Sequence, residues 1–289
     1  MAETVRRTSG QTVVNDMEAL RQRARELLDA GTVQVIIGYA NGSNRRVRPF
    51  FARRPEDLER LILDDRCVLN LAVYLRKPEV KALGKAAVIA TPPLLRSILQ
   101  LAAENHYQES EAVFLALDSA GNVLELSSAE QIAGVLGSLP GSTGQDACVP
   151  SADRMPALSA GSTDRQARFA FWKQEFERCI RCYACRAACP MCYCEQCLVD
   201  SNQPQWIPVA AHSIGNLEWH ISRAMHLAGR CVNCGACSEA CPAGIPLNLV
   251  NQFLADRIQQ EFGQKAGTSA KLDYALSVFS GSDRETFIK

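Results

Sequence analysis

The sequence predicts two domains of different class. We expect an α/β domain over residues 1–138 and a mainly α-helical domain over residues 167–289, with a flexible linker over residues 139–166 between them. Strand-like and helix-like segments alternate before the linker. The linker is rich in Gly, Ser, Pro, Asp and Ala without a period, so it buries too little apolar surface to offset its ordering entropy. Eleven of the 13 cysteines lie beyond it, within residues 179–241.

The α/β domain begins with an amphipathic helix and a strand. The apolar side chains of the helix recur at helical spacing, at Met17, Leu20, Ala24, Leu27 and Leu28. Gly31 follows as a stop signal. Residues 33–40 then read as a buried strand. Pro55 and the two acidic residues after it predict a second helix, because proline suits a first turn and acids suit the positive helix end.

The rest of this domain continues the alternation. Residues 86–90 and 111–117 read as strands, and residues 93–103 read as a helix between them. Ser127 and Glu130 have the spacing of a capping box for a last helix, which ends at Leu136. This order predicts an α/β layer with a parallel or mixed sheet.

The cysteines repeat one pattern. Residues 179–190 read CIRCYACRAACP and residues 231–242 read CVNCGACSEACP, so C-x-x-C-x-x-C-x-x-x-C-P occurs twice. In two-cluster ferredoxins the first three thiolates of such a motif bind one [4Fe-4S] cluster, and the fourth crosses to the other cluster. Neither motif has the paired knuckles or Cys/His sets of structural zinc. The sequence therefore predicts two [4Fe-4S] clusters.

The crossed pattern assigns four ligands to each cluster. Cluster 1 is expected to be bound by Cys179, Cys182, Cys185 and Cys241. Cluster 2 is expected to be bound by Cys231, Cys234, Cys237 and Cys189. Helices are expected over residues 167–178, 217–229 and 247–262. The long interval between the motifs favours a helical dicluster ferredoxin-like domain over the short β-hairpin type.

Composition excludes other classes of protein. Lys plus Arg equals Asp plus Glu at 31 each, so no basic field is available for nucleic acid. No run approaches the roughly 20 apolar residues of a membrane span. Reduced thiols and an N-terminus without an apolar signal region predict a cytoplasmic protein whose partners are other proteins. We find no nucleophile triad or carboxylate pair, so no catalytic residue is assigned.

The motifs resemble those of known redox subunits. Residues 179–197 (CIRCYACRAACPMCYCEQC) and 220–247 (HISRAMHLAGRCVNCGACSEACPAGIPL) are similar to iron–sulfur subunits of formate dehydrogenases, hydrogenases and heterodisulfide-reductase-type complexes. Arg48-Pro49 and residues 67–72 (CVLNLA), which we expect on a helix, resemble the beta subunit family of deazaflavin-dependent hydrogenases and formate dehydrogenases. Where that family has a Gly-Cys-Asp turn, this chain has residues 92–96 (PPLLR), which implies a docking or degenerate N-terminal module.

The resemblance implies an electron-transfer subunit rather than a catalytic one. It would relay electrons between a dehydrogenase or hydrogenase catalytic subunit and a flavin- or heterodisulfide-reductase-like partner. The alternative is a flavin-bearing oxidoreductase beta subunit, whose clusters feed a flavin in the N-terminal domain. The turn at residues 41–44, with nearby arginines, is a candidate for flavin phosphate, although a solvated turn is the simpler reading.

Three surplus thiols follow the first motif, at Cys192, Cys194 and Cys197. They predict a third metal centre, with a [4Fe-4S] cluster or zinc as the occupant, unless they only pack around cluster 2. Its fourth ligand would be Cys67 or Cys148. Cys67 is preferred, because it falls in the segment that resembles the beta subunits, whereas Cys148 lies in the linker.

Overall fold

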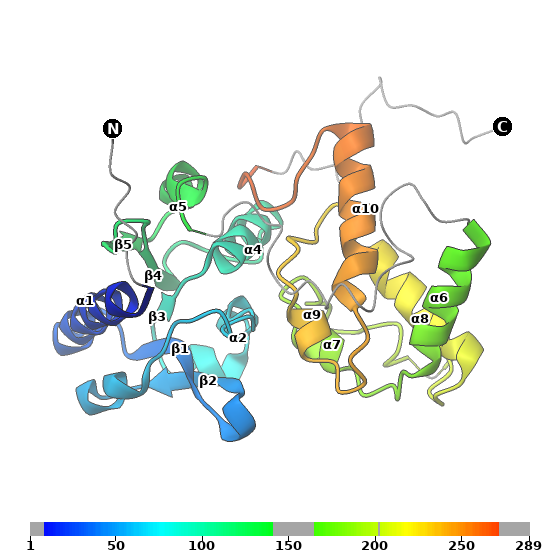
Figure 1. Ribbon diagram of the computed structural model, residues 1–289, viewed down its shortest axis with the longest axis horizontal. Coiled ribbons are helices and arrows are strands. Elements are labelled where there is room, and N and C mark those ends of the chain that lie inside the picture. Colours follow the sequence, from blue (N-terminus) through cyan, green and yellow to red (C-terminus); the bar gives the residue numbers. More distant parts are fainter. Residues whose placement is uncertain (1–8, 141–164, 202, 272–289) are drawn as a thin grey trace.

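The computed structural model describes residues 9–140, 165–201 and 203–271, and shows a part with a sheet beside a helical part (Figure 1). The sheet has five strands in the order β2-β1-β3-β4-β5. The strands are β1 (Val35–Asn41), β2 (Val47–Ala52), β3 (Ala86–Ile89), β4 (Ala112–Leu117) and β5 (Val123–Leu126). The three central strands are parallel, and the edge strands β2 and β5 pair antiparallel with their neighbours. The α/β class is confirmed, with a mixed sheet.

Helices cover both faces of this sheet, which is why the central strands are continuous apolar runs rather than alternating ones. One face packs against α1 (Ser9–Asp29) and the 3-10 helix η2 (Pro55–Arg60). The helices on the other face are α2 (Ala72–Leu75), α3 (Pro78–Lys81), α4 (Pro92–Ala103) and α5 (Ala129–Leu136). A short 3-10 helix, η1 (Ser43–Arg45), connects β1 to β2. Figure 1 shows α2 and α4 on the side that faces the helical part.

The capping box of α5 is shifted by one residue from the expected pair. Ser128 is the cap, and its Oγ accepts a hydrogen bond from the N–H of Gln131 at 3.2 Å. Gln131 Oε1 in turn accepts the N–H of Ser128 at 3.2 Å. The prediction of Ser127 with Glu130 was therefore wrong, because two adjacent serines offered the same spacing to Glu130 and to Gln131.

The prediction of a helix over residues 67–72 was also wrong, since the helix in this segment is α2, Ala72–Leu75. Cys67 lies in a turn, where its N–H donates to the carbonyl of Asp64 at 2.9 Å. The side-chain oxygen of Asn70 accepts the N–H of Ala72 at 3.2 Å and so begins the helix later. The strands β2 and β5 were not expected from the sequence at all.

Within its described residues, the helical part contains the three expected helices and two short ones. The expected helices are α6 (Arg165–Glu177), α8 (Ser213–His226) and α10 (Leu247–Phe262). The short helices α7 (Ala184–Ala187) and α9 (Ala236–Glu239) lie inside the cysteine motifs. α8 begins earlier than predicted, because His212 Nδ1 accepts the N–H of Gly215 at 3.2 Å and caps the helix.

The two parts are packed together at α4. Met191 and Leu227, each 2% exposed, join the apolar core on the α4 face of the sheet. Both carboxylate oxygens of Glu104, which follows α4, accept hydrogen bonds from Arg230 at 2.7 Å. The hydroxyl of Tyr193 donates to the same carboxylate at 2.6 Å. These contacts place the cysteine motifs directly against the α/β layer.

A second contact joins α4 to the segment after α10. Arg96 Nη2 donates to the carbonyl of Ala266 at 3.0 Å, and the N–H of Gly267 donates to Gln100 Oε1 at 3.0 Å. Gly267 has a φ of 69°, and a Cβ there would lie 2.3 Å from the Arg96 carbonyl oxygen, so this close approach requires glycine.

The predicted linker falls mostly on residues 141–164, which lie outside the described residues. The boundaries 1–138, 139–166 and 167–289 therefore remain predictions. In the part of the chain that the structure describes, no helix has both the length and the apolar character needed to cross a membrane.

Candidate iron–sulfur site

The two cysteine motifs share one backbone conformation. The residues on either side of the second cysteine are left-handed in the first motif, with φ of 58° at Arg181 and 56° at Tyr183. The same positions of the second motif have φ of 57° at Asn233 and 76° at Gly235. This conformation costs a non-glycine residue roughly 1–2 kcal/mol. Such backbone directs successive N–H groups into one concavity, an arrangement found at many iron–sulfur sites.

These N–H groups already reach the cysteine sulfurs. The N–H of Arg181 donates to Cys179 Sγ at 3.4 Å. The equivalent N–H of Asn233 hydrogen-bonds the thiol of Cys231 and acts to lower the pKa of that thiol. Hydrogen bonds of this kind stabilise negative charge on sulfur, and they are one of the ways in which a protein sets a cluster potential.

The cysteines assigned to cluster 1 lie around one pocket. Its thiols are Cys179, Cys182, Cys185 and Cys241. Cys185 comes from the short helix α7, whereas Cys241 follows α9 in the second motif. Trp219 and Leu247 line the remaining wall. The fold thus gathers the four thiols that the crossed pattern puts together.

The cysteines assigned to cluster 2 are also neighbours, but they are deeper. Burial, followed by repulsion from Cys189 and Cys237, raises the pKa of Cys234 to about 12. Burial and then repulsion from Cys234, Cys237 and Cys189 raise the pKa of Cys231 as well. Cys189, from the first motif, therefore lies among the three thiols of the second motif.

Arg223 of α8 lies between the two groups of thiols. It is 4% exposed, and its Nη2 donates to the carbonyl of Cys185 at 3.1 Å. Its Nε has no hydrogen-bond partner among the described residues. Burial alone would lower the pKa of Arg223, but electrostatic interaction with Cys189 and Cys237 raises it. A buried guanidinium requires a counter-charge, so this position fits an anionic iron–sulfur cluster.

The α/β domain also supplies groups to the second set of thiols. The Asn70 side chain hydrogen-bonds the thiol of Cys234 and donates to Ser97 Oγ at 2.8 Å. Arg96 is 6% exposed, lies in electrostatic range of Cys231 and Cys234, and has an Nε without a partner in the described residues. Asn70 and Arg96 thus face this site from outside the helical part.

Sequence reasoning did not assign Arg223, Asn70 or the left-handed Arg181 to the site. Arg223 could have been found, since an arginine in the middle of an apolar helix that leads into a cysteine motif suggests a buried counter-charge. Asn70 and the backbone conformation of Arg181 had no comparable signal.

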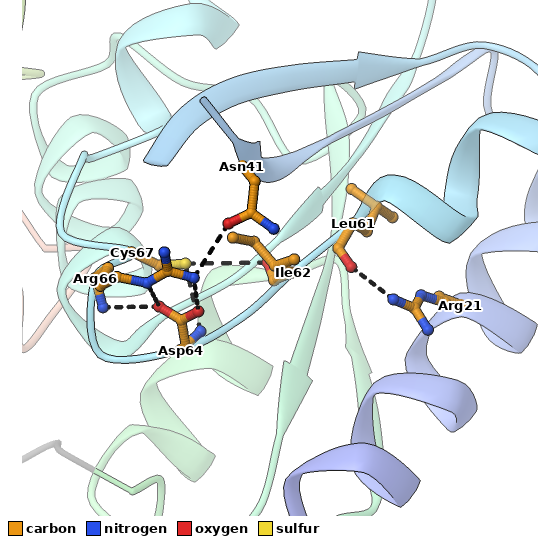
Figure 2. A network of polar contacts seen from close by, with 7 residues as sticks. All are labelled: Arg21, Asn41, Leu61, Ile62, Asp64, Arg66 and Cys67. Carbon is orange, nitrogen blue, oxygen red and sulfur yellow. Dashed lines mark hydrogen bonds and ion pairs between the residues drawn. The ribbon is translucent and has the colours of Figure 1, made fainter. Parts of the chain in front are cut away.

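The surplus thiols gather, but Cys67 does not join them. Cys192, Cys194 and Cys197 line a separate pocket beside α8. Cys67 does not line that pocket, and its sulfur accepts the N–H of Asp64 at 3.4 Å. Figure 2 shows this thiol beside the Asp64–Arg66 ion pair, and burial raises its pKa to about 11. Cys148 lies outside the described residues.

Among the described residues, no group of three or more His, Cys, Asp and Glu side chains is arranged to hold a metal ion. The candidate flavin turn is the connection between β1 and β2, and its Gly42 N–H donates to the Arg46 carbonyl at 2.7 Å. The Asn41 side chain accepts a hydrogen bond from Arg66 at 3.2 Å (Figure 2).

Comparisons with known proteins agree with the site. Residues 175–245 match the family described as a 4Fe-4S dicluster domain. The chain is 33% identical over 102 residues to a protein of Methanocaldococcus jannaschii named F420-dependent formate dehydrogenase subunit beta. It is 29% identical over 105 residues to F420-dependent formate dehydrogenase 1 subunit beta of Methanococcus maripaludis.

These matches cover 35% and 36% of this chain and 26% of each relative, so the chain spans about a quarter of the length of the curated relatives it matches. The resemblance to iron–sulfur beta subunits is confirmed, and the chain carries a 4Fe-4S dicluster domain. The chain is therefore an iron–sulfur protein of the electron-transport type.

Proposed function

We propose that this chain is an electron-transfer subunit of a cytoplasmic redox complex. It relays electrons through two [4Fe-4S] clusters, between a formate dehydrogenase or hydrogenase catalytic subunit and a flavin- or heterodisulfide-reductase-like partner. The observation that carries the proposal is the pocket in which Cys241 joins Cys179, Cys182 and Cys185.

The chain's own residues bind the clusters and set their environment. Thiolates of the two crossed sets hold cluster 1 and cluster 2, which supply one-electron redox chemistry when bound. Arg223 places positive charge between the sets. Asn70 hydrogen-bonds the thiol of Cys234, and Arg96 lies in electrostatic range of Cys231 and Cys234, so the α/β domain forms one side of the cluster 2 site. No residue is assigned a role in substrate chemistry.

The exposure of the two sites suggests where the relay exchanges electrons with a partner. Cys182 is exposed, and the neighbouring Ile180 is 63% exposed. Among the thiols assigned to cluster 2, Cys237 is buried and Cys189, Cys231 and Cys234 are half-buried. An external partner would therefore exchange electrons at cluster 1, where Cys182 reaches the surface.

Metal analysis tests the proposal directly. Protein purified under anaerobic conditions should contain at least about eight iron and eight sulfide per chain, since each cluster holds about four of each. Iron and acid-labile sulfide assays on the full chain measure this. A value near four would mean that one motif is empty and would refute the two-cluster relay.

Anaerobic purification with native partners, followed by mass spectrometry, should identify a dehydrogenase or hydrogenase catalytic subunit. Partners with no redox function would contradict the proposed assignment. The same preparation tests the flavin-bearing alternative, because a yellow chromophore that survives purification would support that alternative instead.

Replacement of Arg223 should change the cluster potentials. In Arg223→Gln the buried positive charge is lost, so a reduced cluster becomes less favourable and the midpoint potential falls. At an effective dielectric constant of 20 the loss is on the order of 1 kcal/mol, roughly 40 mV for one electron. Redox titration followed by electron paramagnetic resonance measures the midpoint potential of each cluster.

Arg223→Lys keeps the charge and should restore most of the potential. Arg257→Gln, on the exposed face of α10, is the matched control and should leave the potential unchanged. Equal midpoint potentials in Arg223→Gln and the wild type would show that the charge of Arg223 does not affect the clusters.

A further inference from the structure

Three cysteines outside the crossed sets lie around a pocket of their own. Cys192, Cys194 and Cys197 line a cavity of about 40 Å³. The cavity at the thiols assigned to cluster 1 has a volume of about 20 Å³. The space beside the surplus thiols is therefore no smaller than the space at a proposed cluster.

Three arginines and a histidine line this pocket. Its walls include Arg186, Arg223, His226 and Arg230. Arg186 has a carboxylate partner in Asp200, at 2.8 and 2.7 Å. Arg223 is 4% exposed, and its Nε has no hydrogen-bond partner in the described part of the chain. Arg230 is paired with Glu104 at 2.7 Å, so Arg223, which also faces Cys189 and Cys237, is the charge on this wall that would stabilise an anionic occupant.

The loop that carries the three thiols is held on both sides. Tyr193, between Cys192 and Cys194, donates its hydroxyl to Glu104 at 2.6 Å, and the Arg76 guanidinium lies 4.5 Å from its ring centre. At the other end, the N–H of Cys197 donates to the Asp200 carboxylate at 3.2 Å. A ligand loop fixed in this way presents its thiols in a constant geometry.

We propose that Cys192, Cys194 and Cys197 bind a third [4Fe-4S] cluster. A closed zinc site takes four ligands, usually from two paired knuckles. Here one short loop supplies three thiols, which suits a cluster whose fourth iron takes a solvent ligand. On binding, each S–H bond is replaced by an S–Fe bond, and one proton per cysteine goes to solvent.

The third cluster extends the proposed relay, on which this inference rests. The thiol of Cys192 donates a hydrogen bond to the sulfur of Cys189, and Cys189 is a proposed ligand of cluster 2. The third site is therefore in contact with cluster 2. It provides a branch of the relay beside α8, in a pocket that shares Trp219 with the cluster 1 pocket.

The experiment measures iron and sulfide in the full chain, prepared under anaerobic conditions. The wild type should contain about 12 of each per chain, and the triple variant Cys192→Ser/Cys194→Ser/Cys197→Ser about eight, a loss of one third. The resonance signals of the other two clusters should persist in the triple variant. Cys67→Ser removes a thiol outside the pocket and should retain the wild-type iron content.

Two results would overturn the third cluster. One is an iron content of about eight in the wild type that is unchanged in the triple variant. The other is one zinc per chain that is lost with the three thiols, with His226 completing the zinc site. If the triple variant does not fold, the wild-type content and the exposed-site variant Cys194→Ser decide the question. A wild type below eight iron would instead refute the two-cluster proposal.

Discussion

The variants Cys234→Ser and Cys241→Ser should each damage a different cluster, although both residues belong to the second motif. Cys241 shares its pocket with the thiols of the first motif, whereas Cys234 lies among Cys237 and Cys189. Each variant should lose up to about four iron per chain, since a cluster that lacks one thiolate is poorly held. Electron paramagnetic resonance of the reduced proteins distinguishes the two remaining signals.

Cys179→Ser provides the matched comparison for this experiment. It should affect the same signal as Cys241→Ser, because both thiols line the cluster 1 pocket. If Cys234→Ser and Cys241→Ser change the same signal, the crossed assignment is wrong. The ligands of each cluster would then come from one motif alone.

The variant Glu104→Gln should be strongly destabilised. Its carboxylate is 3% exposed and accepts hydrogen bonds from Arg230, Tyr193 and Gln100. Removal of one partner of a buried ion pair leaves the other charge uncompensated, and costs about 3–5 kcal/mol in the free energy of unfolding. The midpoint of thermal unfolding should fall on the order of 10 °C.

The control for this variant is Glu261→Gln, which removes an exposed ion pair with Arg257 on α10. An exposed pair contributes about 0–1 kcal/mol, so the control should unfold close to the wild type. Equal midpoints for Glu104→Gln and Glu261→Gln would show that the contact between the two parts of the chain does not stabilise them.

The carboxylate of Glu104 should also make the free energy of unfolding depend on pH. Burial alone would raise the pKa of Glu104, but the hydrogen bonds from Arg230 and Tyr193 hold it below its ordinary value. A lowered carboxyl pKa adds stability above the pKa of the unfolded state, about 4.3, and this stability is lost as pH falls through the folded value. The difference between wild type and Glu104→Gln should be full at neutral pH and shrink in acid.

The sequence by itself determined the chemistry of this protein and the type of most elements. Repeated cysteine spacing needs no tertiary contact to be read, because three thiolates on one short segment already suit a cluster. Long periodic segments such as α1 and α10 were predicted for the same local reason. Local signals failed where two choices were equal, as at Ser127 and Ser128, or where a turn delayed the start of a helix, as at Cys67.

Only the tertiary structure decided what surrounds the sulfurs. Arg96 and Asn70 lie far along the chain from the thiols that they face, so no local pattern marks them. It also decided that Cys67 lies apart from Cys192, Cys194 and Cys197, because a distance between segments depends on how the α/β layer and the helical part pack. That packing depends on Glu104 and Arg230, 126 residues apart, whose pairing requires the folded chain.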